Sequence, residues 1–182
     1  MPNQNELFRG KLVRLAASRP DDGENSAAWA DDASFWRNMD TDYALPKNLD
    51  DQNRPIERDS NSATFRLRTI AEDKLIGFVA IFKIEWNNQS GTLAIGIGDA
   101  QYRGKGYGQD ALQLILRYAF HELNLHRVGL DVNSNNPGAI RAYEKVGFKR
   151  EGAMREAGFR DGHRYDRIVM GILRDEWEQN QK

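Results

Sequence analysis

The residues from Arg103 to Gly108 combine glycine with positive charge directly ahead of a strongly helical run. Gly104, Gly106 and Gly108 are spaced two apart, and glycine permits positive φ angles and close approach of another molecule to the backbone. The first amides of the following helix have no partner within that helix and lie at the positive end of its dipole. Such amides suit a phosphate or pyrophosphate, to which Arg103 and Lys105 add charge. The alternative is a glycine-rich connector with solvated cations.

Two common nucleotide-binding motifs do not fit this stretch. The Walker loop needs Gly-Lys followed by Ser or Thr, whereas Gly106 follows Lys105 here. The dinucleotide fingerprint needs a glycine where Gln101 or Gln109 stands. We therefore expect a phosphate site of another type. A phosphate- or nucleotide-binding module that arose by convergence remains an alternative.

Composition excludes several classes of function. The chain has 182 residues, a formal net charge of −1 and no cysteine. The near-neutral charge gives no overall attraction to nucleic acid or membranes, and the lack of cysteine removes disulfides, thiolate metal sites and cysteine nucleophiles. No stretch reaches the about 18 apolar residues of a membrane span, and the N-terminal sequence has no apolar segment of a secretory signal. We expect a soluble, cytoplasmic protein with no nucleic-acid or membrane partner.

The remaining polar residues show no other catalytic pattern. The histidines at 121, 126 and 163 lack the spacing of metal ligands, so we expect each to be exposed or hydrogen-bonded and expect no metal. No serine lies in a G-x-S-x-G context, which leaves a hydrolase nucleophile without support.

Hydrophobic patterning predicts strands interleaved with helices. The first half of the chain predicts a short strand over 11–15 and then a helix with Ser18 as its N-cap, and a break near Asp31 stays open. Residues 39–62 have no clear pattern and receive no assignment. Further strands are predicted at 65–70, 75–84, 92–98, 127–132, 148–159 and 163–172.

Two helices are predicted in the second half of the chain. Apolar residues at helical spacing between Leu112 and Leu123 form one face of the first helix. The second covers Pro137 to Val146, with Asn136 as N-cap and Gly147 just past its end. Asp161-Gly162 predicts a hairpin turn between the last two strands. Together these elements predict an α+β (mixed α/β) layer fold.

Two segments resemble a known family. Arg103-Gly104-Lys105-Gly106-Tyr107-Gly108 resembles the pattern Q/R-x-x-G-x-G/A of the GNAT superfamily of acetyl-CoA-dependent N-acetyltransferases. Asn135 to Gly152 resembles that family's later N-x-x-A-I-x-x-Y-x-K-x-G-F segment, and the order of the motifs also agrees. The resemblance covers about residues 75–177. Within the superfamily, the chain is most similar to the branch of ribosomal-protein N-terminal and spermidine N-acetyltransferases.

The resemblance implies a single N-acetyltransferase domain over residues 1–182. Residues 1–62 would form acceptor-side helices and a loop, and residues 63–175 the coenzyme-binding core. The fold would be a central twisted mixed sheet, splayed between two parallel strands and flanked by helices. Acetyl-CoA would lie as co-substrate in the V-shaped opening between the strands at 92–98 and 127–132, and the protein would be a possible homodimer.

The resemblance also implies a set of coenzyme-binding residues. The pantetheine arm would pair with the backbone at 96–98, and the alternative is a bent strand without a ligand. The pyrophosphate would bind the amides before the long helix. The implied coenzyme-binding residues are Gly96, Ile97, Gly98, Arg103, Gly104, Lys105, Gly106, Tyr107, Gly108, Gln109 and Asn136.

Tyr143 is the implied general acid, which would protonate the coenzyme sulfur as it leaves. Its ordinary pKa near ~10 keeps the phenol protonated at neutral pH, and the alternative is a core tyrosine on the apolar helix face. Glu85 is a candidate general base that could equally lie in solvent. A water relay would also serve as a base.

The acceptor would bind near Trp36, Asp42 and Tyr43, because aromatic residues beside carboxylates suit a cationic amine. Alternatively, the tryptophans pack the first helices onto the sheet. The implied activity is transfer of an acetyl group to a primary amine (a protein N-terminus, a polyamine or another small amine) by direct attack in a ternary complex. The alternative is a catalytically silent acyl-CoA-binding or sensor protein of the same fold.

Overall fold

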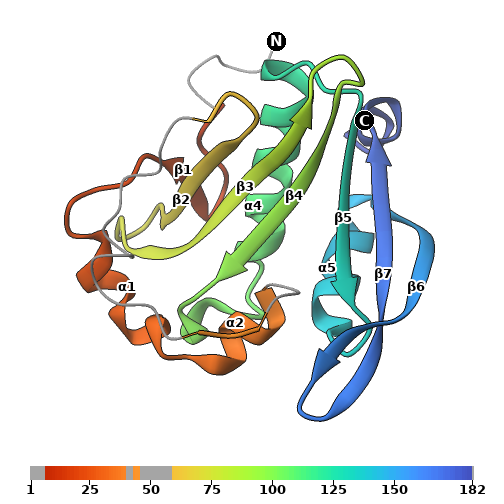
Figure 1. Ribbon diagram of the computed structural model, residues 1–182. Coiled ribbons are helices and arrows are strands. Elements are labelled where there is room, and N and C mark those ends of the chain that lie inside the picture. The colour runs from red at the N-terminus through yellow and green to blue at the C-terminus, as the bar shows by residue number, and fades with distance from the viewer. Residues whose placement is uncertain (1–6, 40–42, 46–58, 182) are drawn as a thin grey trace.

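A mixed sheet forms the centre of the protein, as the computed structural model shows for residues 7–39, 43–45 and 59–181 (Figure 1). Its seven strands follow the order β1-β2-β3-β4-β5-β7-β6. The strands are β1 Val13–Ala16, β2 Ala63–Thr69, β3 Leu75–Glu85, β4 Ser90–Ile97, β5 Arg127–Asn133, β6 Lys149–Arg160 and β7 His163–Leu173. The helices are α1 Asp22–Ala30, α2 Ala33–Met39, α4 Tyr107–Arg117, α5 Pro137–Val146 and α6 Arg174–Gln179, with single turns at Ala100–Tyr102 and Tyr118–Glu122.

The parallel pair β4–β5 divides the sheet. These strands are in register only at Ser90–Arg127, Gly91–Val128 and Thr92–Gly129. Beyond Thr92 they diverge, as Figure 1 shows between the green and the teal strand. All other neighbouring strands are antiparallel. The predicted splayed mixed sheet is therefore confirmed.

Helices α4 and α5 pack on one face of the sheet and close the core there. The predicted apolar face of α4 is buried, with Leu112, Ile115 and Leu116 at most 1% exposed. The same face continues through the turn at 118–122, where Phe120 packs against Trp177 of α6 at a ring distance of 5.5 Å. The helix after Asn136 also has the predicted bounds, with Gly147 at φ +107° past its end. The sequence patterning did not predict α6.

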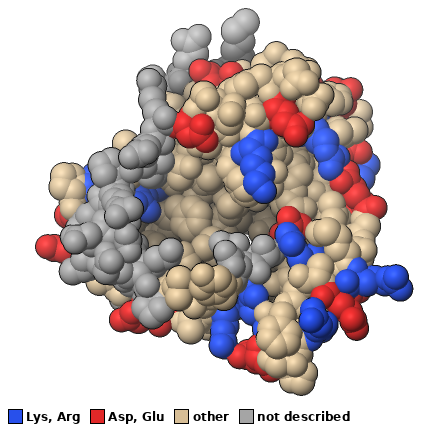
Figure 2. All heavy atoms as spheres, in the orientation of Figure 1, with Lys and Arg blue, Asp and Glu red and all other residues tan. Residues whose placement is uncertain are grey.

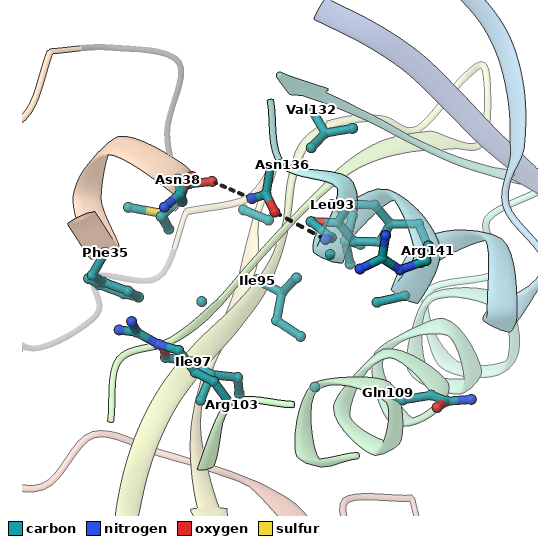
Figure 3. A pocket seen from close by; sticks show the side chains of 18 of the residues that line it. Phe35, Asn38, Leu93, Ile95, Ile97, Arg103, Gln109, Val132, Asn136 and Arg141 are labelled. Carbon is teal, nitrogen blue, oxygen red and sulfur yellow. Dashed lines mark hydrogen bonds between the residues drawn. The ribbon is translucent and has the colours of Figure 1, made fainter. Parts of the chain in front are cut away.

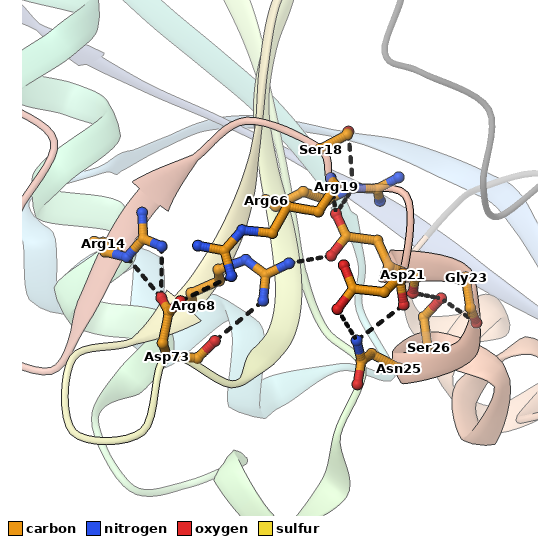
Figure 4. Close-up of polar contacts among 11 residues, drawn as sticks. Arg14, Ser18, Arg19, Asp21, Gly23, Asn25, Ser26, Arg66, Arg68 and Asp73 are labelled. Carbon is orange, nitrogen blue, oxygen red and sulfur yellow. Dashed lines mark hydrogen bonds and ion pairs between the residues drawn. The ribbon is translucent and has the colours of Figure 1, made fainter.

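The first helix begins later than the sequence predicts. It starts at Asp22 rather than after Ser18, and the Ser18 hydroxyl instead accepts a hydrogen bond from Arg66 Nε at 3.3 Å. The cause is Asp22 itself, which is 1% exposed and bound by the buried Arg68 of β2 (Figure 4). Because the ion pair holds Asp22 against the sheet, residues 17–21 form the approach to the helix. The break near Asp31 is present between α1 and α2.

Aromatic side chains of α1 and α2 pack directly on glycines of the sheet. A Cβ atom on Gly98 would lie 1.7 Å from the ring of Trp29, and one on Gly96 would lie 2.9 Å from the ring of Phe35. Both rings are buried, at 8% and 5% exposure. The alternative interpretation of the tryptophans is therefore confirmed for Trp29, which anchors α1 on the sheet.

The described helices are all too short or too polar to cross a lipid bilayer.

Replacement of Gly98 by alanine tests the contact with Trp29. We expect Gly98→Ala to lower the free energy of unfolding by about 1–3 kcal/mol, because the added methyl group overlaps a buried ring. Gly152→Ala in β6 is the matched control, since no atom lies within 4 Å of its added Cβ. Chemical denaturation of the two variants measures the difference. Equal stability of Gly98→Ala and wild type would contradict the packing.

Candidate functional site

The divergence of β4 and β5 opens a cavity of about 730 Å³. Its walls come from α2, β4, β5, α5 and the segment 102–109. Figure 2 shows the corresponding hollow near the middle of this face of the molecule. A cavity of this size fits the range of small-molecule and cofactor sites.

The cavity connects the two faces of the sheet, because strand side chains alternate in direction. Leu93 and Val132 are buried in the core beneath α4 and α5. Gly96 contacts Phe35, which places Gly96 and Ala94 on the opposite face, beside α2. A ligand in the opening therefore has α4 and α5 on one side and α2 on the other.

The backbone before α4 presents unpaired N–H groups. Within the described chain, no backbone carbonyl accepts from the amides of residues 104–109, and the first such bond runs from Asp110 N to Gly106 O at 3.0 Å. Gly104 and Gly106 have φ angles of +71° and +89°, a conformation that glycine adopts without strain. Consecutive donors at a helix N-terminus form an anion site. That they bind a pyrophosphate stays a prediction.

Arg103 does not direct its side chain to these amides. Its Nε donates to the carbonyl of Ile97 at 2.8 Å and its Nη2 to the carbonyl of Gly98 at 2.6 Å. Nη2 also lies 3.2 Å from the carboxylate of Asp32, which caps α2 through the amides of Ser34 and Phe35. The Ser34 hydroxyl also donates to this carboxylate, at 2.6 Å. This bond first, and then those from the Phe35 amide and Arg103, lower the pKa of Asp32. Arg103 therefore joins the end of β4 to the start of α2.

Most of the predicted coenzyme-binding residues line the cavity, but three do not. Gly98, Lys105 and Tyr107 lie outside it. The Gly98 amide donates to Ile76 O at 2.9 Å, the Tyr107 ring packs on Tyr102 at 5.0 Å, and Lys105 is exposed. The predicted residues that line the cavity are Gly96, Ile97, Arg103, Gly104, Gly106, Gly108, Gln109 and Asn136.

Asn136 connects α5 to α2. Its Oδ1 accepts from the Ala139 amide at 3.1 Å, which confirms the predicted N-cap. Its Nδ2 donates to the carbonyl of Asn38 at 3.5 Å (Figure 3). This bond spans the cavity mouth between the two helices.

Tyr143 lies in the wall that α5 contributes. Its ring packs against Phe148 at 5.9 Å, and its hydroxyl has no hydrogen-bond partner among the residues that the structure describes. Burial raises the pKa of Tyr143 to about 12, with a smaller contribution from the negative charge of Asp131. The phenol is therefore protonated at neutral pH, and its proton is free for a ligand.

Three of the predicted catalytic and acceptor residues, Glu85, Trp36 and Tyr43, lie outside the cavity wall. Glu85 is the exposed last residue of β3, where its carboxylate accepts a hydrogen bond from Asn88 Nδ2 at 2.7 Å. This position is at the closed end of the β4–β5 pair. Trp36 packs on Phe35 at a ring distance of 5.0 Å, Tyr43 is 74% exposed, and neither lines the cavity. Asp42 lies outside the described residues.

Three charged residues in the cavity wall were not predicted. Asp131 lies on β5, and Arg141 and Lys145 lie four residues apart on α5. Two sequence patterns could have indicated them. Arg141 and Lys145 are four residues apart and so lie on one face of the helix that carries Tyr143, and Asp131 is a charged residue between two apolar strand residues. In the described ranges, no group of three or more His, Asp or Glu side chains is close enough to hold a metal ion.

Comparisons with known proteins agree with this geometry. Residues 13–149 match the family model of the acetyltransferase (GNAT) domain. The chain is 30% identical over 174 residues to YokL, an uncharacterized N-acetyltransferase from the SPbeta prophage of Bacillus subtilis. This match covers 95% of this chain and 96% of YokL. It is 35% identical over 107 residues to the spermidine N(1)-acetyltransferase of Vibrio cholerae, 59% of this chain and 61% of that protein.

A solved structure shows the same similarity in three dimensions. The crystal structure of spermidine N-acetyltransferase from Vibrio cholerae, in complex with CoA and spermine, superposes with a TM-score of 0.80 and 26% sequence identity. The match covers 91% of this chain and 98% of that one.

Titration of the tyrosines tests the environment of Tyr143. We expect one phenol to ionise near pH 12, because burial stabilises its neutral form. The folded state thus binds this proton more tightly, so the stability that the neutral phenol provides is complete below pH 10 and is lost as the pH approaches 12. Phenolate absorbance measures the titration, and Tyr143→Phe removes the late step. A late step that persists in this variant would contradict the assignment.

Proposed function

The chain belongs to the GNAT acetyltransferase family, and we propose that it transfers an acetyl group from acetyl-CoA to a primary amine. One observation carries this proposal: the amides of residues 104–109, which bond no backbone carbonyl, and the phenol of Tyr143, which has no hydrogen-bond partner in the described structure, lie at the same cavity. The first suits a diphosphate and the second suits a departing thiolate. The two faces of the opening give coenzyme and amine separate entrances.

The coenzyme is proposed to lie on the face that α4 and α5 cover. Its pyrophosphate binds the amides of residues 104–109, and Arg141 and Lys145 add positive charge in the same cavity. The pantetheine arm follows the open edge of β4, where Gly96 and Ile97 have no partner strand on the side of β5. The thioester then lies where the two strands part.

Tyr143 is proposed as the general acid. The acceptor arrives mainly as a cation and first gives one proton to solvent. Its neutral nitrogen then attacks the thioester carbonyl carbon, the carbon–sulfur bond breaks, and the phenol gives its proton to the thiolate. The nitrogen of the new amide loses a second proton, and this proton returns to the phenolate through solvent. A phenol with a pKa of about 12 holds its proton until negative charge develops on sulfur.

The acceptor is proposed to enter beside α2, where Asn38 and Met39 line the cavity. Polyamines are one candidate class, because the similar protein from Vibrio cholerae was crystallised with spermine. Protein N-termini and other small amines share the same primary amine. Trp36 and Tyr43, which lie outside the cavity wall, stay proposed acceptor-side residues, and so does Asp42.

The proposal extends to the setting of the enzyme. We place it in the cytoplasm, since its chain has no cysteine and its co-substrate is acetyl-CoA, and we propose a homodimer. The sequence divides into an acceptor-side part at 1–62 and a coenzyme-binding core at 63–175. Sedimentation measures the oligomeric state.

Thiol release from acetyl-CoA tests the proposed function. The protein is incubated with acetyl-CoA and, in turn, spermidine, spermine, a peptide with a free N-terminus and small primary amines. We expect CoA release that depends on one of these amines, with a product heavier by one acetyl group. Binding of acetyl-CoA without amine-dependent release would identify a silent acyl-CoA-binding protein instead.

A Tyr143→Phe variant tests the general acid. We expect turnover to fall at least tenfold, within the ~10²–10⁴ range of general acid catalysis. Affinity for acetyl-CoA is expected to stay the same, because the ring remains. Steady-state kinetics and calorimetry separate the two quantities, and unchanged turnover would remove Tyr143 from the mechanism.

A further inference from the structure

Asp131 is the single carboxylate among the described residues of the cavity wall. The other charged side chains there are Arg103, Arg141 and Lys145. An amine acceptor arrives mainly as a cation, because a primary amine has a pKa near that of lysine, ~10.4. Arg141 and Lys145 suit the phosphates of the coenzyme, and Arg103 is bound to Asp32, so Asp131 is the group whose charge suits the acceptor.

The strand register places Asp131 at the point where the sheet opens. Thr92 and Gly129 form the last β4–β5 pair, so Ala94 and Asp131 come two residues later on opposite sides of the opening. Side chains two residues apart share a face, and Leu130 and Val132 are buried in the core of the other face. Asp131 therefore lies on the face of α2, where the acceptor is proposed to enter.

Arg167 holds this carboxylate on one side only. Arg167 Nε donates to Asp131 Oδ2 at 2.9 Å, and Arg167 Nη2 bonds the same oxygen. Arg167 comes from β7, which lies on the far side of β5 from the cavity. Asp131 Oδ1 has no partner in the part of the chain that the structure describes, and the side chain is 29% exposed.

One neighbour supports a ligand at this position. Asp131 and Tyr143 line the same cavity, and the charge of Asp131 contributes, after burial, to the raised pKa of that phenol. Asn133 follows on the same face of β5, but its Oδ1 lies against Gly158 of β6 and not toward β4. Asp131 is therefore the β5 side chain that offers an oxygen acceptor next to Tyr143.

We propose that Asp131 binds the acceptor amine through Oδ1 and directs its nitrogen to the thioester. Arg167 is the positioning residue that fixes the carboxylate. This inference rests on the proposed function and deepens it, since it assigns the recognition of a compact, positively charged primary amine to one side chain. Alcohols and neutral amides lack the charge that this carboxylate selects.

The isosteric variant Asp131→Asn tests the inference, because it removes the charge and keeps the shape. We expect the KM for the best amine of the panel to rise at least tenfold, while the Kd of acetyl-CoA changes less than twofold. Glu151→Gln is the matched control. Glu151 also forms an ion pair with an arginine on the same sheet, Arg127, at 2.5 Å, but it lies outside the cavity. The KM of Glu151→Gln for the amine should therefore equal that of wild type.

The role of Arg167 is tested by a split between KM and kcat. Arg167→Gln should raise the KM for the amine several-fold with a smaller change in kcat, and Arg167→Lys should restore part of the affinity. A merely structural role would lower the thermal midpoint of Arg167→Gln without changing this KM. That result would overturn the assignment of Arg167.

Direct binding keeps this test separate from the test of the proposed function. Calorimetry measures spermidine binding to the CoA-loaded wild type, Asp131→Asn and Glu151→Gln proteins. Weaker binding in Asp131→Asn alone supports the inference, even if wild type releases no thiol and the proposed activity fails. Equal amine affinity and equal KM in Asp131→Asn and wild type would overturn it. Loss of acetyl-CoA affinity in Asp131→Asn, or no amine binding by wild type, would also overturn it.

Discussion

The loss of pairing between β4 and β5 after Thr92 is the constraint on which the rest of the structure depends. Backbone groups on the facing edges beyond this point have no partner strand, and unpaired buried backbone groups are costly unless a ligand or water meets them. The closed end is stabilised instead by strand pairing, which runs from Ser90–Arg127 to Thr92–Gly129. Helices α4 and α5 pack on one face of the sheet beside the separation. The sheet therefore remains continuous although β4 and β5 separate after Thr92.

The acceptor-side helices are fixed to this opening by a small number of strong contacts. The buried pair of Asp22 and Arg68 holds α1 to β2, and removing one partner of such a pair costs about 3–5 kcal/mol. Trp29 then packs on Gly98, and Asp32 connects α2 to Arg103. The segment that presents the anion site is thereby joined to the helix beside the proposed acceptor entrance.

Local patterns were sufficient for most elements and for part of the site. The apolar spacing between Leu112 and Leu123, the Asn136 cap and the Asp161-Gly162 turn depend on neighbours in sequence, and each was found where expected. The β4 glycines and Arg103 were harder to interpret. Gly98 provides space for an indole from α1, and the guanidinium of Arg103 binds backbone carbonyls of β4. The contact of Gly98 with Trp29 joins segments that are distant in sequence, whereas Arg103 bonds carbonyls only five and six residues before it, across a turn that its residue type does not specify.

The sequence by itself determined the helix N-terminus with free amides, the tyrosine on the later helix and the succession of strands and helices along the chain, because these follow from residue type and short-range spacing. Only the tertiary structure decided which polar groups share the cavity. It placed Glu85 at the closed end of the strand pair and Asp131 at the open end. The physical reason is register: a side chain's position along a sheet depends on its partner strands, and no local pattern specifies where two parallel strands cease to pair.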